Sequence, residues 1–363
     1  SHHSYPLSVA RYLIIRLSAM GDVAMLIPLL YAVARANEQH EFILLTQPFF
    51  TELLLDAPDN VEGMAIDIRR GEERSFLGLL RYARRLRHEH FDAVLDLHDV
   101  LRTKVLRSIL RLTGVPTQHL IKPREGRRRL VADSATKDLT PLPPMWSLYQ
   151  QVFRSAGLSV PEAIPPVAIH PSLRATFERL HPELTQPTPG RLRLGIAPFA
   201  STRAKTYDPA LMQEALHLIE ESERFEIFLF GSRGKEQAQI EQWATNRPHV
   251  HSVAGRLDLS DELILIASMD AMVSMDSANM HLASMVGTRV FSVWCCTHPA
   301  AGFLGIGQRL EDCLQPEDAP RRPCSIFGDN RHCHTGPDFA CSRALRPERI
   351  LEAVLTLSEG AAS

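Results

Sequence analysis

RLSAMGDVAMLIP, at residues 16–28, decides the fold that we expect, because it joins an apolar strand to an apolar helix through a short polar loop. The run YLIIRL (residues 12–17) is typical of a buried strand, and the apolar residues after Asp22 are typical of a buried helix. Gly21 permits a tight backbone turn, and Asp22 comes at or near the helix start. Pro28 would fall in the second turn of a helix that began right after Asp22, so we expect that helix to kink or to begin later.

Short apolar runs separated by longer amphipathic stretches extend this pattern along the chain. The first series continues at residues 42–46 and 93–97. A second series occupies residues 193–197, 225–230, 270–275 and 289–294, with helical segments such as 209–222 and 235–246 between its strands. This is the rhythm of a parallel sheet covered by helices, so the sequence predicts an α/β fold with two domains.

The domain boundaries follow from composition. The prolines of residues 161–190 block a continuous helix or a central strand and mark an interdomain connection. We therefore expect a first domain at residues 1–165, a connection at 166–190 and a second domain at 191–345. Residues 346–363 hold a last helix and a tail, which could pack across to the first domain. A chain of 363 residues with 45% hydrophobic and 23% charged residues can bury two such cores.

The formal net charge of −2 hides a basic segment. Residues 102–129 contain a single acid, Glu125, and the following basic residues: Arg102, Lys104, Arg107, Arg111, Lys122, Arg124, Arg127, Arg128 and Arg129. Such a patch in a near-neutral protein indicates an anionic partner at one place, not coating by nucleic acid. Residues 100–112 predict a helix with Lys104, Arg107 and Arg111 on one face and Leu101, Val105, Ile109 and Leu112 on another. A solvated basic face is the alternative.

Two features bear on location. No apolar run reaches the length of about 18 residues that a membrane-spanning helix needs. The start, SHHSYPLS, is typical of a tag remnant rather than of a signal peptide. We therefore expect a cytoplasmic protein with reduced thiols.

The loops after the strands are the first places to look for chemistry, because open α/β sheets bind ligands beyond the carboxyl ends of their strands. The loops after residues 12–17 and 270–275 contain Asp22 and Asp276. Either aspartate could simply cap the following helix, which contributes about 1 kcal/mol. The helix after Asp276 also offers free N–H groups and a positive dipole end, suited to a diphosphate. His281 on that helix could equally be an ordinary helix histidine.

Two further loops are weaker candidates. FASTRAKTYDP (residues 199–209) combines hydroxyls with Lys205, as phosphate sites do, although a solvated turn is the alternative. FGSRGKEQAQ (residues 230–239) has two glycines at a strand-to-helix turn but lacks the spacing of a P-loop and of G-x-G-x-x-G. That absence argues against an alternative enzyme class, the nicotinamide-dependent oxidoreductases.

These four loops, in this order, resemble glycosyltransferase family 9, the heptosyltransferases that build the inner core of bacterial lipopolysaccharide. LIIRLSAMGDV (residues 13–23) is similar to the family's strand-S-x-x-G-D opening, and SMDSANMHLASMVGTRVFSVW (residues 274–294) to its D-[ST]-G-x-x-H-L-A segment. The resemblance covers nearly the whole chain. It implies a GT-B fold, in which two Rossmann-like domains face a cleft, with the acceptor on the first and the nucleotide sugar on the second.

The resemblance also implies a reaction and its residues. An inverting glycosyltransferase of this kind moves a heptose or related sugar from an ADP-sugar to an anionic, lipid-linked inner-core acceptor, and it could contact the inner-membrane surface. Asp22 matches the catalytic base, and Lys205 matches a donor-phosphate contact. The implied donor-binding residues are Ser201, Thr202, Glu236, Asp276, Ser277, Ala278 and His281. The implied acceptor-binding residues are Ser18, Gly21, Arg102, Lys104, Arg127 and Arg128.

Two departures from the family pattern leave an alternative open. Ala278 stands where the family usually has glycine, and Cys295–Cys296 stands where glycine–proline is common. A binding protein that keeps the fold without turnover is therefore the second hypothesis.

We expect no metal and no cofactor. The chain has no Asp-x-Asp triplet, the usual carboxylate pair for a magnesium–diphosphate clamp. The tail holds Cys313, Cys324, Cys333 and Cys341 together with His332 and His334, but its C-x8-C and C-x7-C gaps are longer than those of zinc knuckles. Buried thiols or an adventitious disulfide are favoured there over structural zinc.

Overall fold

The computed structural model describes residues 8–360, except for the side chains of 358–360. Most of the expected tag remnant and the last three residues of the expected tail therefore lie outside the described residues. The chain divides into two compact units. The first unit comprises the chain up to Lys122 together with Met145–Val167, and the second comprises Pro123–Pro144 together with the chain from Ala168 onward.

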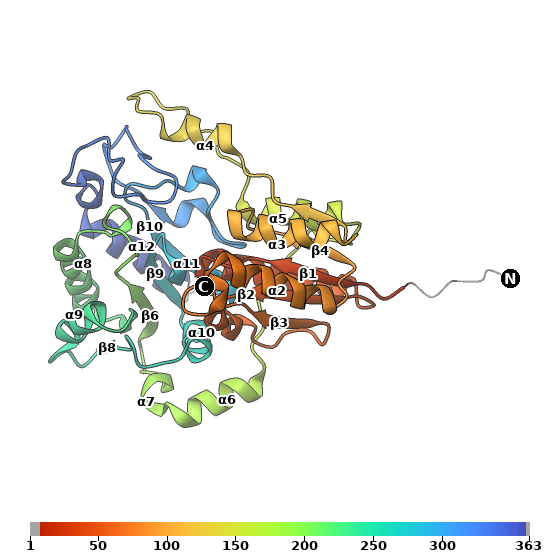
Figure 1. Ribbon diagram of the computed structural model, residues 1–363. Helices are drawn as coiled ribbons and strands as arrows, with labels where there is room; N and C mark the ends of the chain where they lie inside the picture. The colour runs from red at the N-terminus through yellow and green to blue at the C-terminus, as the bar shows by residue number, and fades with distance from the viewer. Residues whose placement is uncertain (1–7, 361–363) are drawn as a thin grey trace. The chain divides into compact units, whose positions relative to one another are not determined.

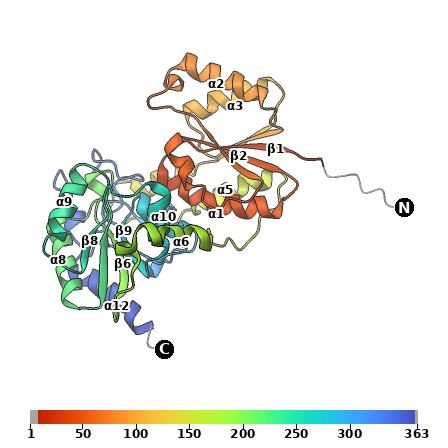
Figure 2. The ribbon, with the colours of Figure 1, turned by 90° about the horizontal axis from the view of Figure 1, so that it is seen from below.

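The first unit is built on a five-stranded parallel sheet. Its order is β3 (Val61–Ala65), β2 (Glu41–Thr46), β1 (Arg11–Ile15), β4 (Ala93–Asp96) and β5 (Thr117–His119). Helices α2 (Phe76–His88) and α3 (Leu101–Leu112) cover one face, and α1 (Met20–Ala36) and α5 (Met145–Ser155) cover the other (Figure 2). Short 3-10 helices lie at Pro48–Leu53 and Glu72–Arg74. Leu13 and Ile15 join the core beneath α2 and α3, and because both faces are covered, the strand is apolar from Leu13 to Ile15.

The second unit contains a six-stranded parallel sheet (Figure 1). Its order is β11 (Cys313–Leu314), β10 (Val290–Val293), β9 (Ala271–Met275), β6 (Leu192–Ala197), β7 (Phe225–Leu229) and β8 (Val250–Ser252). Its helices are α4 (Arg124–Val131), α6 (Pro171–Leu180), α7 (Pro182–Thr185), α8 (Pro209–Glu221), α9 (Lys235–Ala244), α10 (Leu259–Ala267), α11 (Ala278–Met285) and α12 (Pro347–Gly360). Short 3-10 helices lie at Arg203–Lys205, Pro299–Ala301, Leu310–Asp312 and Ala340–Arg343.

Each sheet reverses its strand order at one point. In the first unit the chain builds β1, β2 and β3 outward and then returns to place β4 on the other side of β1. In the second unit the same happens between β6 and β9. Ligands of doubly wound sheets bind beyond the carboxyl ends of the strands at such reversals. The loops after β1 and β4, and those after β6 and β9, are therefore the places that the topology selects.

The structure agrees with the predicted α/β class and with every predicted strand, but it corrects one expected domain boundary. Residues 123–144 belong to the second unit, not to the first domain in which we placed them. The last helix packs on α8, in the second unit. As expected, no continuous helix fills the proline-rich connection. It contains two short helices, and Pro171 and Pro182 each occupy a first helical position, where a missing N–H costs nothing.

None of the helices between residues 8 and 360 combines the length and the apolar character that a membrane crossing requires.

Candidate functional site

Asp22 lies in the first turn of α1, directly beyond the end of β1. The helix begins at Met20, with Ala19 as its N-cap, so it begins earlier than we expected and runs through Pro28. Gly21 is a buried helical residue with no positive φ, so our expectation of a glycine turn was wrong. The Ala19 N–H donates to Oδ2 of Asp22 at 3.2 Å. Asp22 therefore accepts a backbone N–H at the helix start, as a cap does. It does so as a residue of the first turn and not as the N-cap itself.

Arg16 fixes the loop that carries Asp22. The residue is 8% exposed. Its Nη2 lies 2.9 Å from Oδ2 of Asp22, its Nε donates to the Ser18 carbonyl at 2.6 Å, and its Nη1 donates to the Leu97 carbonyl at 3.0 Å. The Asp22 side chain remains 20% exposed. The result is a carboxylate held in position at a strand end with one part still open to solvent.

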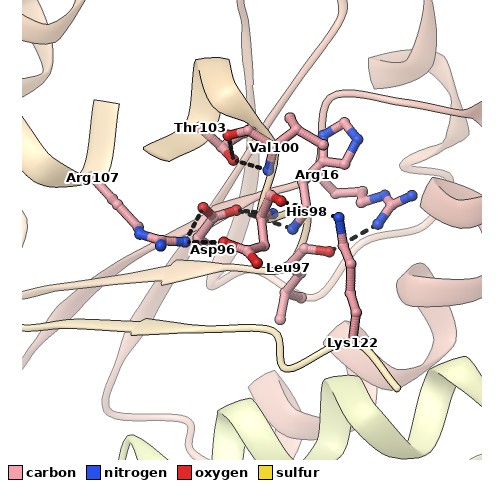
Figure 3. A network of polar contacts seen from close by, with 9 residues as sticks. Arg16, Asp96, Leu97, His98, Val100, Thr103, Arg107 and Lys122 are labelled. Carbon is pink, nitrogen blue, oxygen red and sulfur yellow. Dashed lines mark hydrogen bonds and ion pairs between the residues drawn. The ribbon is translucent and has the colours of Figure 1, made fainter. Parts of the chain in front are cut away.

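The loop after β4 is organised by the fully buried Asp96 (Figure 3). Its Oδ1 accepts the N–H groups of His98 and Asp99 at 3.0 and 2.9 Å. Nη1 of Arg107 lies 2.8 Å from both Asp96 and Asp99. Burial would raise the pKa of Asp99, but the hydrogen bond and charge of Arg107 lower it overall. Lys122 completes the turn by donating to the Asp99 carbonyl at 3.0 Å.

His98 is the residue of this loop that faces the loop after β1. Its Nδ1 accepts the Leu17 N–H at 3.3 Å. Burial, and then the charge of Arg16, lower its pKa to about 3 even though Asp22 acts in the opposite direction. Sequence reasoning missed His98 and Arg16, although LHD (residues 97–99) follows a predicted strand and the strand-end rule could have selected it.

The basic residues expected to bind the acceptor belong to two different units. Arg102 and Lys104 are exposed on α3 of the first unit. Arg127 lies in the second unit, with its guanidinium over the rings of Phe303 and Phe327 at 5.7 and 5.2 Å from their centroids. Arg128, on the same helix as Arg127, is exposed. The six expected acceptor residues therefore do not form one surface of one unit.

The faces predicted for α3 also need correction. Arg107 is turned inward to Asp96 and does not share a solvated face with Lys104 and Arg111. The residues buried beneath the helix are Thr103, Leu106 and Leu110, whereas Leu101 and Leu112 of the expected apolar face are 78% and 88% exposed. Only Val105 and Ile109 of that face pack, in part, against the core.

In the second unit, Asp276 follows β9 and precedes α11. The N-cap of α11 is Ser277, so the interpretation of Asp276 as a cap is wrong. Oδ2 of Asp276 instead accepts the Thr297 hydroxyl at 2.9 Å and lies 4.0 Å from Nζ of Lys205. Ala278 is the first residue of the helix, and His281 is buried one turn further on. The structure thus brings Asp276 and Lys205 together, and it adds Thr297, which we had not placed in the site.

Lys205 ends the short 3-10 helix Arg203–Lys205 in the loop after β6. Ser201 is exposed, and the buried hydroxyl oxygen of Thr202 has no hydrogen-bond partner among the described residues. The cysteine-bearing tail covers this loop. Gly328 has φ +77°, and a Cβ there would lie 2.2 Å from Cγ of Lys205, so only glycine allows the approach.

Glu236 lies in the first turn of α9. Its Oε1 accepts the Ser232 N–H at 3.3 Å, so it closes the glycine-containing turn after β7. Gly234, in that turn, has φ +95°. The structure shows Glu236 at a strand end, and its expected contact with a ribose stays a prediction.

The loop after β10 is braced much as the loop after β1 is. Arg322, 5% exposed, donates to the carbonyls of Cys295 and Thr297 at 2.5 and 2.6 Å. All six cysteines are free thiols: Cys324 and Cys341 of the tail are buried, and Cys313 and Cys333 are partly so. In the part of the chain that the structure describes, no group of three or more His, Cys, Asp and Glu side chains could hold a metal ion.

The comparisons with known proteins identify the family and the fold. Residues 79–322 match the family model of glycosyltransferase family 9 (heptosyltransferase). The sequence matches none of the curated proteins with which it was compared.

Solved structures that share the fold include the ADP-heptose lps heptosyltransferase II of E. coli, 19% identical, with a TM-score of 0.68 over 97% of this chain and 100% of that one. A family 9 glycosyltransferase from Veillonella parvula is 14% identical, with a TM-score of 0.74 over 98% and 99%. The E. coli heptosyltransferase WaaC with ADP is 15% identical, with a TM-score of 0.66 over 96% and 99%. The chain therefore belongs to glycosyltransferase family 9, and it is a glycosyltransferase with the α/β architecture called GT-B.

Proposed function

We propose that the protein is an inverting, metal-independent glycosyltransferase that moves a heptose or related sugar from an ADP-sugar to an anionic acceptor of the lipopolysaccharide inner core. The observation that carries this proposal is the carboxylate of Asp22, fixed by Arg16 and partly open at the end of β1. The family model, and solved relatives described as ADP-heptose heptosyltransferases, support the choice of sugar and nucleotide.

The base chemistry follows from this carboxylate. In an inverting transfer, Asp22 accepts the proton of the attacking acceptor hydroxyl while the new bond forms to the anomeric carbon and the bond from that carbon to the diphosphate breaks. An ionised carboxylate is a weak base for a neutral hydroxyl. It therefore acts mainly as the attacking oxygen becomes positive in the transition state.

The leaving ADP needs stabilisation of the charge that builds on its diphosphate. Lys205 and the free N–H groups at the start of α11 are the groups assigned to this role, because Lys205 lies 4.0 Å from Asp276 at the same strand-end loops. The unpartnered Thr202 hydroxyl has the hydrogen-bonding capacity to add a further contact. Ser201, Ser277, Ala278, His281 and Glu236 complete the proposed donor site.

The acceptor role is assigned first to the segment after β1 that contains Asp22 and to the exposed side of α3, both in the first unit. Ser18 and Gly21 shape the loop, and the exposed Arg102 and Lys104 offer charges to an acidic, phosphorylated sugar. Arg127 and Arg128, on α4, are also proposed to bind the acceptor. A soluble protein at the cytoplasmic face of the inner membrane, attracted there by its basic residues, fits an acceptor that is anchored in lipid.

The test is transfer from ADP-heptose to lipid A that carries the sugar acid Kdo, comparing native protein with Asp22→Asn. The asparagine oxygen can still accept the Ala19 N–H, so the helix start is kept while the base is lost. We expect kcat to fall by about 100-fold or more. Affinity for ADP, measured by calorimetry, should stay within about twofold, and added EDTA should leave native turnover unchanged.

The exposed acid Glu38, just beyond α1, supplies the matched control: Glu38→Gln should transfer at the native rate. Native protein that binds ADP but transfers nothing to this acceptor would exclude the proposed reaction. Equal kcat in native protein and Asp22→Asn would remove Asp22 from its role as base.

A further inference from the structure

His98 lies in the loop after β4, and Asp22 lies in the first turn of the helix after β1, two segments that the topology of the first unit places side by side. β1 and β4 are parallel neighbours, with Ile15 opposite Asp96 in register. Both chains leave the sheet at the same edge, and the Leu17 N–H is hydrogen bonded to the ring of His98. The imidazole is therefore fastened to the loop that carries Asp22, at the strand reversal where doubly wound sheets bind ligands.

The hydrogen bonds of His98 fix its tautomer. Because Nδ1 accepts the Leu17 N–H, the hydrogen of the neutral ring is on Nε2. The ring stays neutral near pH 7, since burial and Arg16 lower its pKa to about 3. Among the described residues, none forms a hydrogen bond with Nε2. His98 thus presents a neutral N–H donor that the fold has oriented and left available.

A neutral donor is the chemistry that a sugar-binding position beside a catalytic carboxylate requires. The attacking oxygen keeps a lone pair for the anomeric carbon, so a donor beside it serves to hold a neighbouring oxygen of the acceptor. Arg16 already pairs with Asp22. A second cation there would weaken the carboxylate further as a base, whereas a neutral imidazole donates without adding positive charge.

We propose that His98 is an acceptor-binding residue, whose Nε2–H donates a hydrogen bond to an oxygen of the hydroxyl-bearing acceptor beside Asp22. This inference rests on the proposed function, because it takes the acceptor to bind in the first unit. It adds to that proposal a residue that positions the acceptor and has no part in binding the donor.

Two substitutions separate the two nitrogens of the ring. In His98→Asn the amide oxygen can replace Nδ1 and accept the Leu17 N–H, but no donor remains at the position of Nε2. In His98→Gln the amide nitrogen reaches the position of Nε2, and the bond to Leu17 is lost. A structural role predicts that His98→Asn is the better tolerated variant, and acceptor binding predicts the reverse.

The experiment measures transfer by native protein and both variants with the donor and acceptor named above, together with the melting temperature. We expect kcat/KM for the acceptor to fall about tenfold in His98→Asn, the effect of one lost neutral hydrogen bond, with an unchanged KM for the donor. His98→Gln should remain within about threefold of native protein. His88→Asn, an exposed histidine at the end of α2, serves as the control and should behave as native protein.

The outcomes distinguish the inference from the function on which it rests. If native protein transfers and His98→Asn has the native kcat/KM, or if activity follows the melting temperature across both variants, the inference is wrong and the function stands. If native protein neither transfers to nor binds this acceptor in calorimetry, the proposed function fails and the role of His98 fails with it. If native protein only binds the acceptor, weaker binding by His98→Asn alone supports the inference without the reaction.

Discussion

Arg16 and Arg322 each fix a strand-end loop by the same physical means. Each guanidinium is buried and donates in several directions at once, Arg16 to two carbonyls and to Asp22, and Arg322 to the carbonyls on either side of Cys296. A planar guanidinium has donors in a rigid fork, so it can hold separate chain segments that a lysine ammonium on a flexible stem could not. Replacement of either residue by lysine is therefore not conservative.

Glu262 on α10 gives a prediction at the scale of one residue. Burial raises the pKa of this carboxyl from 4.5 to about 7. The native state therefore binds more protons than the unfolded state between these two values, and stability is lost as the pH rises through that range. We expect Glu262→Gln to raise the free energy of unfolding by about 2 kcal/mol more at pH 8 than at pH 5. Urea unfolding at the two pH values measures this difference.

Glu178 on α6 is the matched control, because its side chain is exposed and Glu178→Gln should change stability equally at both pH values. A pH-independent gain in Glu262→Gln would mean that burial does not penalise the charge of Glu262.

The residues that sequence reasoning found, and those that it missed, differ in the range of their interactions. Asp22 and Asp276 were found because each lies between an apolar strand and the body of the next helix, which is a local pattern. The partners that were missed lie farther along the chain: Asp276 accepts from Thr297, and Arg16, which pairs with Asp22, also donates to the Leu97 carbonyl. A sequence pattern shows where a loop begins, whereas the group that a side chain meets across the sheet depends on strand order.

At the scale of elements, all four strands that the sequence did not predict are the edge strands of their sheets. They are β3 and β5 in the first sheet, and β8 and β11 in the second. An edge strand pairs on one side only and need not be apolar along its length; in β3, for example, Glu62 and Ala65 are exposed. The interior strands were predicted because burial on both faces demands continuous apolar runs.

Helix α3 yields the prediction for this scale. Arg107 ties the helix to the fully buried Asp96 at the end of β4, whereas Arg111, one turn later, is exposed and has no ion pair among the described residues. Removal of the Arg107 side chain leaves the buried charge of Asp96 without its ion-pair partner. We therefore expect Arg107→Leu to lower the free energy of unfolding by about 3 kcal/mol and Arg111→Leu to change it by less than about 0.5 kcal/mol.

Urea unfolding of both variants makes the measurement, and the helix itself is the control, since both substitutions replace an arginine by leucine on α3. Equal effects of the two substitutions would show that the ion pair with Asp96 does not hold the helix in place.

At the scale of the whole molecule, the basic segment of residues 102–129 is continuous in sequence but divided between the two units. Residues after Lys122 belong to the second unit through contacts with the tail: Asp133 pairs with Arg321 at 3.2 Å, and Lys137 donates to the Pro323 carbonyl. These partners are 188 and 186 positions apart in the chain. Local composition could not reveal them, and this is why the expected first domain included residues 123–144.

The division into units predicts where a nucleotide will act. If the donor binds to the loops after β6 and β9, as proposed, saturating ADP should slow amide hydrogen exchange most at residues 201–206 and 276–281, because a ligand that binds only the folded state suppresses local opening around it. Residues 98–107, in the first unit, should change far less. Amide exchange measured by mass spectrometry, with and without ADP, tests this prediction. Lys205→Met should reduce the protection that ADP gives, whereas the control Arg174→Met, at an exposed position, should not. Protection confined to residues 98–107 would instead assign the nucleotide to the first unit and reverse the proposed roles of the two units.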